Sequence, residues 1–461
     1  MAETIHDLVI HDEYIQSLIQ TGPDGNGGIQ KILARAAKGD GLELEDAASL
    51  LNMSGDSCLN ELYSTARQVK EKIFGKRIVL FAPLYISNRC TNNCLYCGFR
   101  RDNQQADRRT LSLSEIVEQA AFLYNRGYRR LLLVAGEDPS VSSVEYLIDA
   151  VSAIYRETRI RIVHVNAAPM AAEEFSRLKA SGAGVYQCFQ ETYHRETYER
   201  MHPSGSKSDY HGRLSVMDRA MQGGFDDIGM GALLGLYDYR FEALSLIAHA
   251  RYLEQRHGAG PHTISVPRLR PAQGAALINA PFPVSDQDFK KIVSVYRLSV
   301  PYAGVVVSTR EGAGLRDQVI HLGASQISAG SRTDIGGYTH PEEGGGASQF
   351  SLNDTRSLDD MVRSILGAGL VPSLCTACYR SGRTGARFRS EAEKGGIRDY
   401  CLPNALFSLM EYLRDHASEE TRAQGVRMVR ESLSALQDHS LRRKLEKSLE
   451  RVAGGEEDVH L

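Results

Sequence analysis

Three cysteines close together in the first quarter of the chain are spaced to bind an iron–sulfur cluster. They are Cys90, Cys94 and Cys97, in the stretch NRCTNNCLYCGF, and they form a C-x3-C-x2-C pattern with Tyr96 just before the last cysteine. Three thiolates on one loop can each bind one iron of a four-iron cubane, which leaves the fourth iron without a protein ligand. The spacing therefore predicts a cluster with one iron open to a small molecule.

The other interpretations of these cysteines are a zinc site, a disulfide with a spare thiol, and buried thiols. A structural zinc ion takes four ligands, and no fourth Cys or His lies close by in the sequence. The chain has only 8 cysteines in 461 residues, and its first twenty residues carry acids throughout, unlike a secretory leader. These features favour the cluster.

A second cysteine triplet lies far along the chain. Cys375 and Cys378 form C-x2-C, and Cys401 follows after twenty-two residues. Three thiolates again predict a cluster with one exchangeable site. Zinc is the alternative here, and it would need a fourth ligand from elsewhere. The remaining cysteines, Cys58 and Cys188, fit neither triplet and are expected to be small buried side chains.

Short apolar strands alternate with amphipathic helices over residues 77–337. This alternation predicts parallel strands joined by crossover helices, and so many units favour an α/β fold with a (βα)8 TIM-type barrel over an open sheet. An incomplete barrel of six units is the alternative. The expected strands are IVLFAPL, YRRLLLVAGE, IRIVHVNAA, GVYQCFQE, DDIGMGALLG, HTISVPRL, AGVVVSTRE and ASQISAG.

Helical extensions are expected on both sides of the barrel. Residues 1–76 form the N-terminal extension, with a glycine-rich break at residues 22–28 and a charged helix around residues 34–53. Residues 338–461 form a C-terminal helical region that carries the second cysteine triplet. A loop rich in glycine and acids, over residues 333–358, leads into it, and two or three charged amphipathic helices end it.

Chemistry in a parallel barrel lies at the carboxyl ends of the strands, so the residues that end each strand are candidates. Ala135, Gly136 and Glu137 end the second strand. Small residues there permit close approach, and a carboxylate with backbone carbonyls can accept hydrogen bonds from an ammonium group. Asn166 closes the third strand and Glu191 the fourth, although a helix cap is the ordinary role for such residues.

Two further residues are candidates for binding roles. Arg310 ends the strand VVVST, and a planar guanidinium can hold a carboxylate through two hydrogen bonds. The alternative is an ion pair of Arg310 with Glu311 on the rim. His262 opens the strand HTISVPRL, and it is a candidate metal ligand, although a lone histidine is most often an ordinary surface or core residue.

Composition excludes several classes of partner. The net charge is -3, with 42% hydrophobic and 24% charged residues, which is typical of a globular protein with a large core. Nothing in this balance favours nucleic acid or an anionic membrane, and no uncharged run approaches the length of a membrane span. The protein is therefore expected in the cytoplasm.

These motifs resemble a known family. A C-x3-C-x2-C loop followed by a small acid motif is the pattern of the radical S-adenosylmethionine (SAM) enzymes. The segments APLYISNRC, VVVSTRE and CFQETYHRETYERMHPSGSKSDY resemble the HydG- and ThiH-like aromatic amino acid lyases of that class. The cysteine tail is similar to that of the HydG type, the tyrosine lyases of FeFe-hydrogenase maturation, and ThiH-type 2-iminoacetate synthases of thiamine synthesis lack it. One departure is Ala-Gly-Glu where many members have two glycines.

The resemblance implies an enzyme with two sites. A 4Fe–4S cluster on the first triplet would bind SAM and generate a radical that abstracts hydrogen from L-tyrosine, which then splits into p-cresol and dehydroglycine. An auxiliary 4Fe–4S cluster on the second triplet would carry an additional labile iron bound by His262. On that iron the dehydroglycine fragment would become carbon monoxide and cyanide for the hydrogenase active site.

The resemblance also implies cofactor contacts and partners. SAM would be contacted by Ala135, Gly136, Glu137, Asn166 and Glu191, and the tyrosine carboxylate by Arg310. Free cysteine is a candidate ligand of the extra iron, ferredoxin or flavodoxin would supply electrons, and other hydrogenase maturases would receive the product. The alternatives are a 2-iminoacetate synthase, a lyase whose tail cluster only relays electrons, and a non-catalytic iron–sulfur scaffold.

Overall fold

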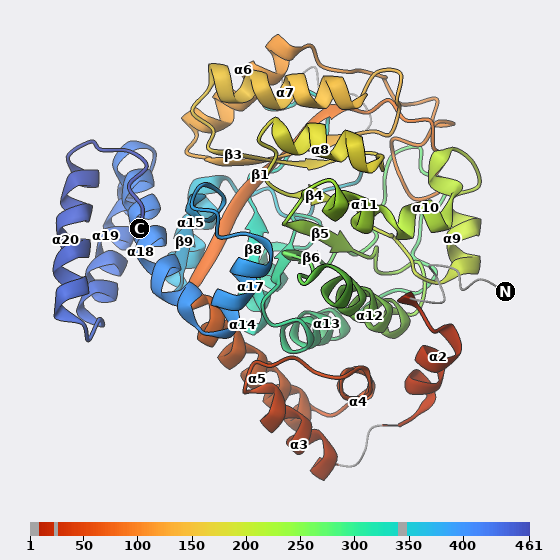
Figure 1. Cartoon of the computed structure of the whole chain (residues 1–461), viewed down its shortest axis with the longest axis horizontal. Coiled ribbons are helices and arrows are strands. Elements are labelled where there is room, and N and C mark those ends of the chain that lie inside the picture. The colour runs from red at the N-terminus through yellow and green to blue at the C-terminus, as the bar shows by residue number, and fades with distance from the viewer. Residues whose placement is uncertain (1–8, 23–25, 340–347) are drawn as a thin grey trace.

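The computed structural model describes residues 9–22, 26–339 and 348–461. A closed barrel of eight parallel strands forms its centre, with helices around it (Figure 1). This arrangement confirms the predicted (βα)8 barrel and excludes the barrel of six units. The strands are β1 Arg77–Ser87, β2 Arg130–Ala135, β3 Ile162–Asn166, β4 Tyr186–Gln187, β5 Ile228–Gly231, β6 Thr263–Ser265, β7 Gly304–Val307 and β8 Ala324–Ser328.

The long first strand closes the barrel. Its second half pairs with β2, where Ala82 lies opposite Leu131, and its middle pairs with β8, where Phe81 lies opposite Ser328. Each strand is therefore covered by the barrel interior on one face and by a layer of helices on the other. Burial on both faces explains why the strands are continuous apolar runs rather than alternating patterns.

Helices link the strands and form the outer layer. Hydroxyl side chains begin several of them: the Ser112 side chain accepts a hydrogen bond from the Glu115 N–H, and the Glu115 carboxylate accepts one from the Ser112 N–H. The connecting helices are α6 Leu113–Asn125, α7 Val144–Glu157, α8 Ala172–Ala180, α9 Arg195–Met201, the 3₁₀-helix η1 Ser206–Ser208, α10 Tyr210–Leu214, α11 Val216–Gln222, α12 Tyr239–His257, α13 Asp286–Ser299 and α14 Ala313–Leu322.

The N-terminal helices differ from the sequence prediction in two ways. They are α2 Asp12–Gln20, α3 Asn26–Ala36, α4 Leu44–Asn52 and α5 Asp56–Phe74. The single helix expected over residues 34–53 is wrong, because Gly39 and Gly41 adopt φ angles of 82° and 92° and turn the chain between α3 and α4. The glycine-rich break is shorter than expected, since α3 already begins at Asn26; residues 23–25 lie outside the described residues.

The C-terminal region attaches to the bottom of the barrel through a short strand that the sequence analysis missed. Strand β9, Val371–Ser373, pairs in parallel with the start of β1, where Arg77 lies opposite Val371. In the loop expected over residues 333–358, residues 340–347 lie outside the described part. The helices of this region are α15 Leu358–Gly367, α16 Ala377–Arg380, α17 Gly385–Glu393, α18 Gly396–Asp415, α19 Glu419–Ser434 and α20 His439–Ala453.

The two extensions contact helices of the barrel and each other. Helices α4 and α5 contact α12 and α13, and α18 contacts α5 and β9 while α19 and α20 pack against α18 (Figure 1). Both extensions thus help to cover the lower end of the barrel. Within the described ranges, no helix has the length and apolar character needed to cross a membrane.

Candidate active site

The first cysteine triplet lines a large cavity at the carboxyl ends of the strands. Cys90, Cys94 and Cys97 follow β1 directly, and all three contribute to the cavity wall. The cavity encloses about 1410 Å³ of space, part of which is open to solvent. The three cysteines therefore face a space in which a small molecule could bind.

Backbone hydrogen bonds hold the cysteine loop in place from two sides. The Thr91 N–H donates to the Glu137 carbonyl over 3.0 Å, and the Leu95 N–H donates to the Met201 carbonyl over 3.0 Å. The Asn92 side chain links the segments of Glu137 and Lys207. Its amide nitrogen donates to Glu137 Oε2 over 2.8 Å, and its amide oxygen accepts from the Lys207 N–H over 2.8 Å. These hydrogen bonds fix the position of the cysteine loop at the carboxyl ends of the strands.

Burial disfavours the thiolate forms of the three cysteines of this loop. It raises the pKa of Cys90 and Cys94, and it raises the pKa of Cys97 to about 11. Binding of a cluster must therefore release the thiol protons. Lys207 and Arg213 line the same cavity and can balance part of the thiolate charge, so the residues present fit a cluster held by three cysteines.

Gly136 and Glu137 connect the cysteine loop to β2. A side chain at Gly136 would place its Cβ 2.2 Å from the Arg89 carbonyl oxygen, so only glycine fits this close approach. The Glu137 carboxylate accepts hydrogen bonds from Arg213 Nη1 over 2.6 Å and from Asn92. Burial alone would raise the pKa of Glu137. The positive charge of Arg213 is the largest of the effects that oppose burial, and together they lower the pKa of Glu137 below its usual value. Glu137 therefore lines the cavity as a carboxylate, together with Ala135.

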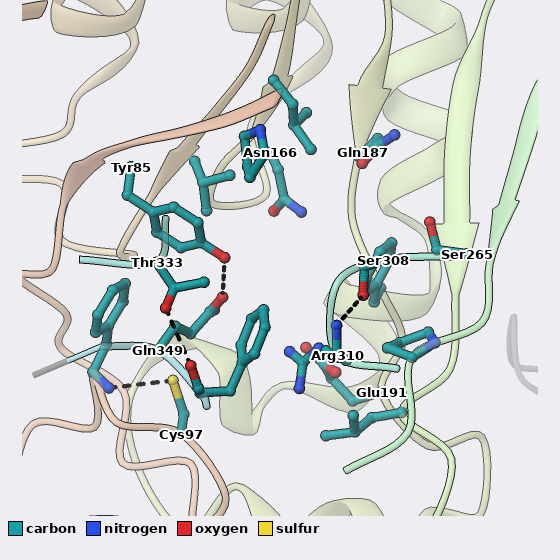
Figure 2. Close-up of a pocket in the computed structure, with 18 of the residues that line it drawn as sticks. Tyr85, Cys97, Asn166, Gln187, Glu191, Ser265, Ser308, Arg310, Thr333 and Gln349 are labelled. Atoms are coloured by element: carbon teal, nitrogen blue, oxygen red, sulfur yellow. Dashed lines mark hydrogen bonds between the residues drawn. The ribbon is translucent and has the colours of Figure 1, made fainter. Parts of the chain in front are cut away.

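Asn166 and Glu191 line the same cavity (Figure 2). Asn166 is the last residue of β3, whereas Glu191 lies four residues beyond β4 and has a φ angle of 70°. Such a conformation is costly for a residue other than glycine and is often found at functional sites. Lys207 Nζ donates to Glu191 Oε1 over 2.6 Å, so this carboxylate is paired with a buried cation.

Arg310 points into the cavity and is stacked on an aromatic ring (Figure 2). Its guanidinium carbon lies 3.3 Å from the centre of the Phe350 ring. Among the described residues its guanidinium has no ion pair, because Glu311 binds Arg268 and Arg270 instead. The Arg310–Glu311 pair considered as the alternative is therefore wrong, and Arg310 keeps its donors for a ligand.

Polar side chains from β1 and from the loop after β8 complete this cavity at the carboxyl ends of the strands, called here the upper cavity. Tyr85 donates its hydroxyl hydrogen to Gln349 Oε1 over 2.7 Å, and Thr333 donates to the Phe350 carbonyl over 3.1 Å. Figure 2 shows Tyr85, Gln349 and Thr333 on the side of the cavity opposite Arg310. The loop after β8 thus forms one wall of the cavity.

The second cysteine triplet lines a separate, smaller cavity at the amino ends of the strands. Cys375 lies two residues after β9, Cys378 is in α16 and Cys401 is in α18, and His262, just before β6, lines the same space. The thiols of Cys378 and Cys401 share a hydrogen bond, which lowers the pKa of Cys378 and raises that of Cys401. The tertiary fold therefore brings His262 to the three tail cysteines.

Two arginines in the lower cavity have unused donors. Arg130 Nη2 donates to the Cys375 carbonyl over 2.9 Å, but the Nε atoms of Arg77 and Arg130 are buried without a partner among the described residues. Buried donors without partners are costly, and an anionic group would satisfy them. This donor set fits a thiolate-bound cluster. Nowhere among the described residues, including this cavity, do three Cys, His, Asp or Glu side chains lie close enough together to bind a single metal ion.

The two cavities share the same strands. Phe81, Leu132, Val306 and Ser328 line the upper cavity, and Val79, Arg130, Gly304 and Gln326, each two residues earlier in the same strand, line the lower one. Side chains alternate along a strand with a rise of about 3.3 Å per residue, so these two layers are about 7 Å apart. Two adjacent layers of side chains therefore separate the cavities.

Several residues of the two sites were missed by sequence reasoning. Lys207 and Arg213 pair with the cavity carboxylates, and Arg270 lines the cavity beside Arg310. Lys207 lies in the segment CFQETYHRETYERMHPSGSKSDY, so its presence in a motif was the available signal. Of the two cysteines outside the triplets, Cys188 is buried as expected and Cys58 is only half-buried.

The fold and the cysteine loop together define a radical SAM barrel, and comparisons with known proteins agree. The family model of the Radical SAM superfamily matches residues 84–246, and that of the Biotin and Thiamin Synthesis associated domain matches residues 265–371. The chain is 33% identical to 2-iminoacetate synthase of Escherichia coli over 350 residues, which cover 75% of this chain and 90% of the relative.

Solved structures extend the likeness to nearly the whole chain. A crystal structure of HydG, a maturase of the [FeFe]-hydrogenase, superposes with a TM-score of 0.93 at 44% identity and covers 98% of this chain and 100% of its own. The HydG maturase from Carboxydothermus hydrogenoformans gives a TM-score of 0.83 at 41% identity, with 95% and 96% covered.

The chain belongs to the family of radical SAM enzymes that contains the HydG maturases and the 2-iminoacetate synthases. Its cofactors accordingly include a 4Fe–4S cluster and SAM.

Proposed function

We propose that this enzyme is a tyrosine lyase of FeFe-hydrogenase maturation. It cleaves L-tyrosine into p-cresol and dehydroglycine in the upper cavity, and the dehydroglycine fragment becomes carbon monoxide and cyanide in the lower one. The observation that carries the proposal is the placement of two cysteine triplets in two cavities at opposite ends of one barrel. A 2-iminoacetate synthase needs only the upper site.

The extent of the similarity supports the same choice. The match to 2-iminoacetate synthase covers 75% of this chain, whereas the match to the HydG crystal structure covers 98% and includes the cysteine tail. A second cluster is therefore part of the proposal, and the tail is more than a structural extension.

In the upper cavity, Cys90, Cys94 and Cys97 hold the SAM-binding cluster. Ala135, Gly136, Glu137, Asn166 and Glu191 line the place where SAM binds next to it. When bound, the cluster and SAM supply the radical chemistry. Arg310 binds the tyrosine carboxylate, since its guanidinium is fixed on Phe350 and has no carboxylate partner among the described residues.

In the lower cavity, Cys375, Cys378 and Cys401 hold the auxiliary cluster, and His262 binds the extra iron, with free cysteine as a further ligand. The iron is cargo that leaves with its carbon monoxide and cyanide. Dehydroglycine is hydrolysed by water, so an enclosed route between the sites protects it. The short separation of the cavities, which is two adjacent layers of side chains, supports such a route.

The partners follow from this chemistry. A ferredoxin or flavodoxin supplies electrons to the upper cluster, other hydrogenase maturases accept the product, and the enzyme works in the cytoplasm. Each of these partners can be tested by anaerobic reconstitution with the purified protein.

An anaerobic assay tests the proposed reaction. The purified enzyme is supplied with SAM, tyrosine, cysteine, ferrous iron and dithionite, and p-cresol, cyanide and carbon monoxide are measured together, with SAM omitted as the control. All three products are expected. Formation of p-cresol without carbon monoxide or cyanide would instead identify a 2-iminoacetate synthase or a lyase with a relay cluster, and no p-cresol at all would favour a scaffold.

A further inference from the structure

His262 is held at the bottom of the barrel by its backbone and by aromatic contact. Its N–H donates to the Ile228 carbonyl over 2.9 Å, which ties the start of β6 to the start of β5. The Phe388 ring, from α17, packs against the imidazole with 4.7 Å between ring centres. The imidazole is therefore confined, and its two nitrogens face different neighbours.

Asp227 faces one of these nitrogens. It is only 2% exposed, and its Oδ1 lies 3.3 Å from His262 Nδ1. The same oxygen accepts a hydrogen bond from the Gly385 N–H over 2.9 Å, whereas Oδ2 is buried without a partner among the described residues. His262 Nδ1 is itself buried without a hydrogen bond among the described residues, so its approach to Asp227 is a close electrostatic contact. A buried carboxylate in this position favours a proton on Nδ1.

The other nitrogen faces the cysteine tail. His262 Nε2 lies 3.3 Å from the hydroxyl of Tyr379, and Tyr379 directly follows Cys378 in α16. With the proton on Nδ1, the Nε2 lone pair accepts the Tyr379 hydroxyl hydrogen, and a bound iron would take the place of that hydrogen. That lone pair is therefore directed to the side of the imidazole where the tail cysteines lie.

We propose that Asp227 is the positioning residue for His262, which fixes the imidazole with its Nε2 lone pair toward the iron bound at the tail. Metal-binding histidines commonly donate their second nitrogen to a carboxylate in this way, and the carboxylate raises their basicity. This inference rests on the proposed function, because it takes His262 to be the ligand of the extra iron. It adds a residue to which that function assigned no role.

A purely structural role for Asp227 is the competing explanation. Its hydrogen bond to Gly385 anchors the first turn of α17, which lies between Cys378 and Cys401. Loss of Asp227 could therefore loosen the tail without any effect specific to His262. Asparagine separates the two roles, since its oxygen still accepts from Gly385 but attracts the Nδ1 hydrogen of His262 more weakly than a carboxylate does.

The experiment measures binding of ferrous iron to the tail of the full-length chain. Cys90, Cys94 and Cys97 are replaced by alanine so that only the tail carries a cluster, which is reconstituted anaerobically with iron and sulfide. Ferrous iron is then titrated, and the extra iron is measured as the iron retained per chain above the cluster iron after free iron is removed. Asp227→Ala, Asp227→Asn and His262→Ala are compared in this background.

Neighbouring Asp226 provides the matched control. It is exposed, and its side chain contacts Thr384 rather than His262. Asp226→Ala is expected to bind the extra iron with unchanged affinity. The thermal midpoint of each variant and its content of cluster iron report whether the tail remains folded.

The inference expects Asp227→Ala to weaken binding of the extra iron about 10- to 100-fold, the usual cost of losing such a partner. Asp227→Asn should fall between this variant and the parent, with the tail cluster intact. Wild-type affinity in Asp227→Ala overturns the inference. If Asp227→Ala loses the tail cluster itself, the test rests on Asp227→Asn, and an affinity of that variant for the extra iron equal to the parent's overturns the inference.

His262→Ala separates failure of this inference from failure of the proposed function. If His262→Ala loses the extra iron and the Asp227 variants keep it, only the positioning role is wrong. If His262→Ala binds the extra iron as tightly as the parent, the ligand assignment in the proposed function is wrong, and the positioning role fails with it.

Discussion

Side chains in the upper cavity divide into those that already have partners and those that are available to a ligand. The carboxylates of Glu137 and Glu191 are paired with Arg213 and Lys207. Arg310, in contrast, is held by contact with a ring and has no carboxylate partner among the described residues. An oriented cation of this kind is what recognition of a carboxylate requires, because no existing ion pair must first be broken.

Replacement of Arg310 tests that role. Arg310→Lys exchanges a planar fork for a point charge, so it should raise the Michaelis constant for tyrosine about 10-fold or more. SAM binding should persist, because the residues proposed to hold SAM are untouched. Steady-state kinetics of p-cresol formation and calorimetric SAM titration check both parts. An unchanged Michaelis constant for tyrosine would contradict the assignment.

Gly136 offers a second test at the level of one residue. Gly136→Ala would place a methyl group 2.2 Å from the Arg89 carbonyl oxygen, so the cysteine loop must shift. Iron bound to the first triplet should fall, and the protein should lose about 1–3 kcal/mol of stability. The measurements are iron per chain after reconstitution and the free energy of unfolding.

Gly314→Ala is the matched control for Gly136→Ala. Gly314 lies in the first turn of α14, and a Cβ there meets nothing within 4 Å. Alanine in a helix is favoured over glycine, so stability should rise by about 0.5–1 kcal/mol and iron binding should stay the same. Equal behaviour of the two variants would rule out the steric argument.

Among the elements, β1 connects the two sites. Its amino-terminal residues pair with β9, which leads into Cys375, and its carboxyl end leads into Cys90. Helix α5, which immediately precedes β1, packs against α13, α14 and α18. This helix therefore fixes the strand on which both cysteine loops depend.

Helix α5 also buries a lysine without a partner, which makes stability depend on pH. Lys70 is 1% exposed, and its ammonium has no hydrogen-bond partner among the described residues. Burial lowers the pKa of Lys70 to about 7. Between pH 7 and about 10.5 the unfolded chain binds a proton that the folded chain does not, so this residue makes stability rise with pH over that window.

Lys70→Met should remove this contribution. The variant is expected to gain about 1–3 kcal/mol near pH 7, where the buried amine is costly, and to show a flatter rise in stability from pH 7 to 10. Urea unfolding at several pH values measures both effects, with exposed Lys31→Met as the control. A pH profile in which Lys70→Met and the parent stay parallel would contradict the prediction.

At the scale of the whole molecule, the two cysteine triplets belong to one barrel but to different ends of it. The upper triplet follows the carboxyl end of β1, and the lower triplet is gathered at the amino ends of the strands by β9, α16 and α18. Because the two proposed ligand sets do not overlap, different steps should depend on each set.

Removal of each triplet should separate these steps. Alanine at Cys375, Cys378 and Cys401 should leave SAM cleavage and p-cresol formation substantially intact, while carbon monoxide disappears and cyanide falls. Alanine at Cys90, Cys94 and Cys97 should abolish 5′-deoxyadenosine and p-cresol. Product analysis, iron content and electron paramagnetic resonance on the two variants provide the measurements.

Zinc in the tail would give a different result for the same pair of variants. The chain lacking the upper cysteines would then carry about one zinc and negligible iron, since a structural zinc site closes around a single ion. A single cluster signal that vanishes entirely with the upper cysteines would also contradict the two-site mechanism.

The sequence by itself determined the barrel and the upper cysteine triplet, because both are local patterns. Apolar runs of strand length alternate with helices, and Cys90, Cys94 and Cys97 lie within one loop. The sequence did not reveal β9, which at three residues is too short to stand out from a loop. It also predicted one helix where Gly39 and Gly41 turn the chain.

Only the tertiary structure decided which charges meet. Glu137 pairs with Arg213 across 76 residues, and Asp227 approaches His262 and Gly385 from different elements. Such contacts depend on strand order and register, which bring distant segments together. The tertiary structure also decided that Arg310 and Glu311 do not pair. Although they are adjacent in sequence, Arg310 contacts Phe350 and Glu311 binds Arg270, because the chain turns after β7.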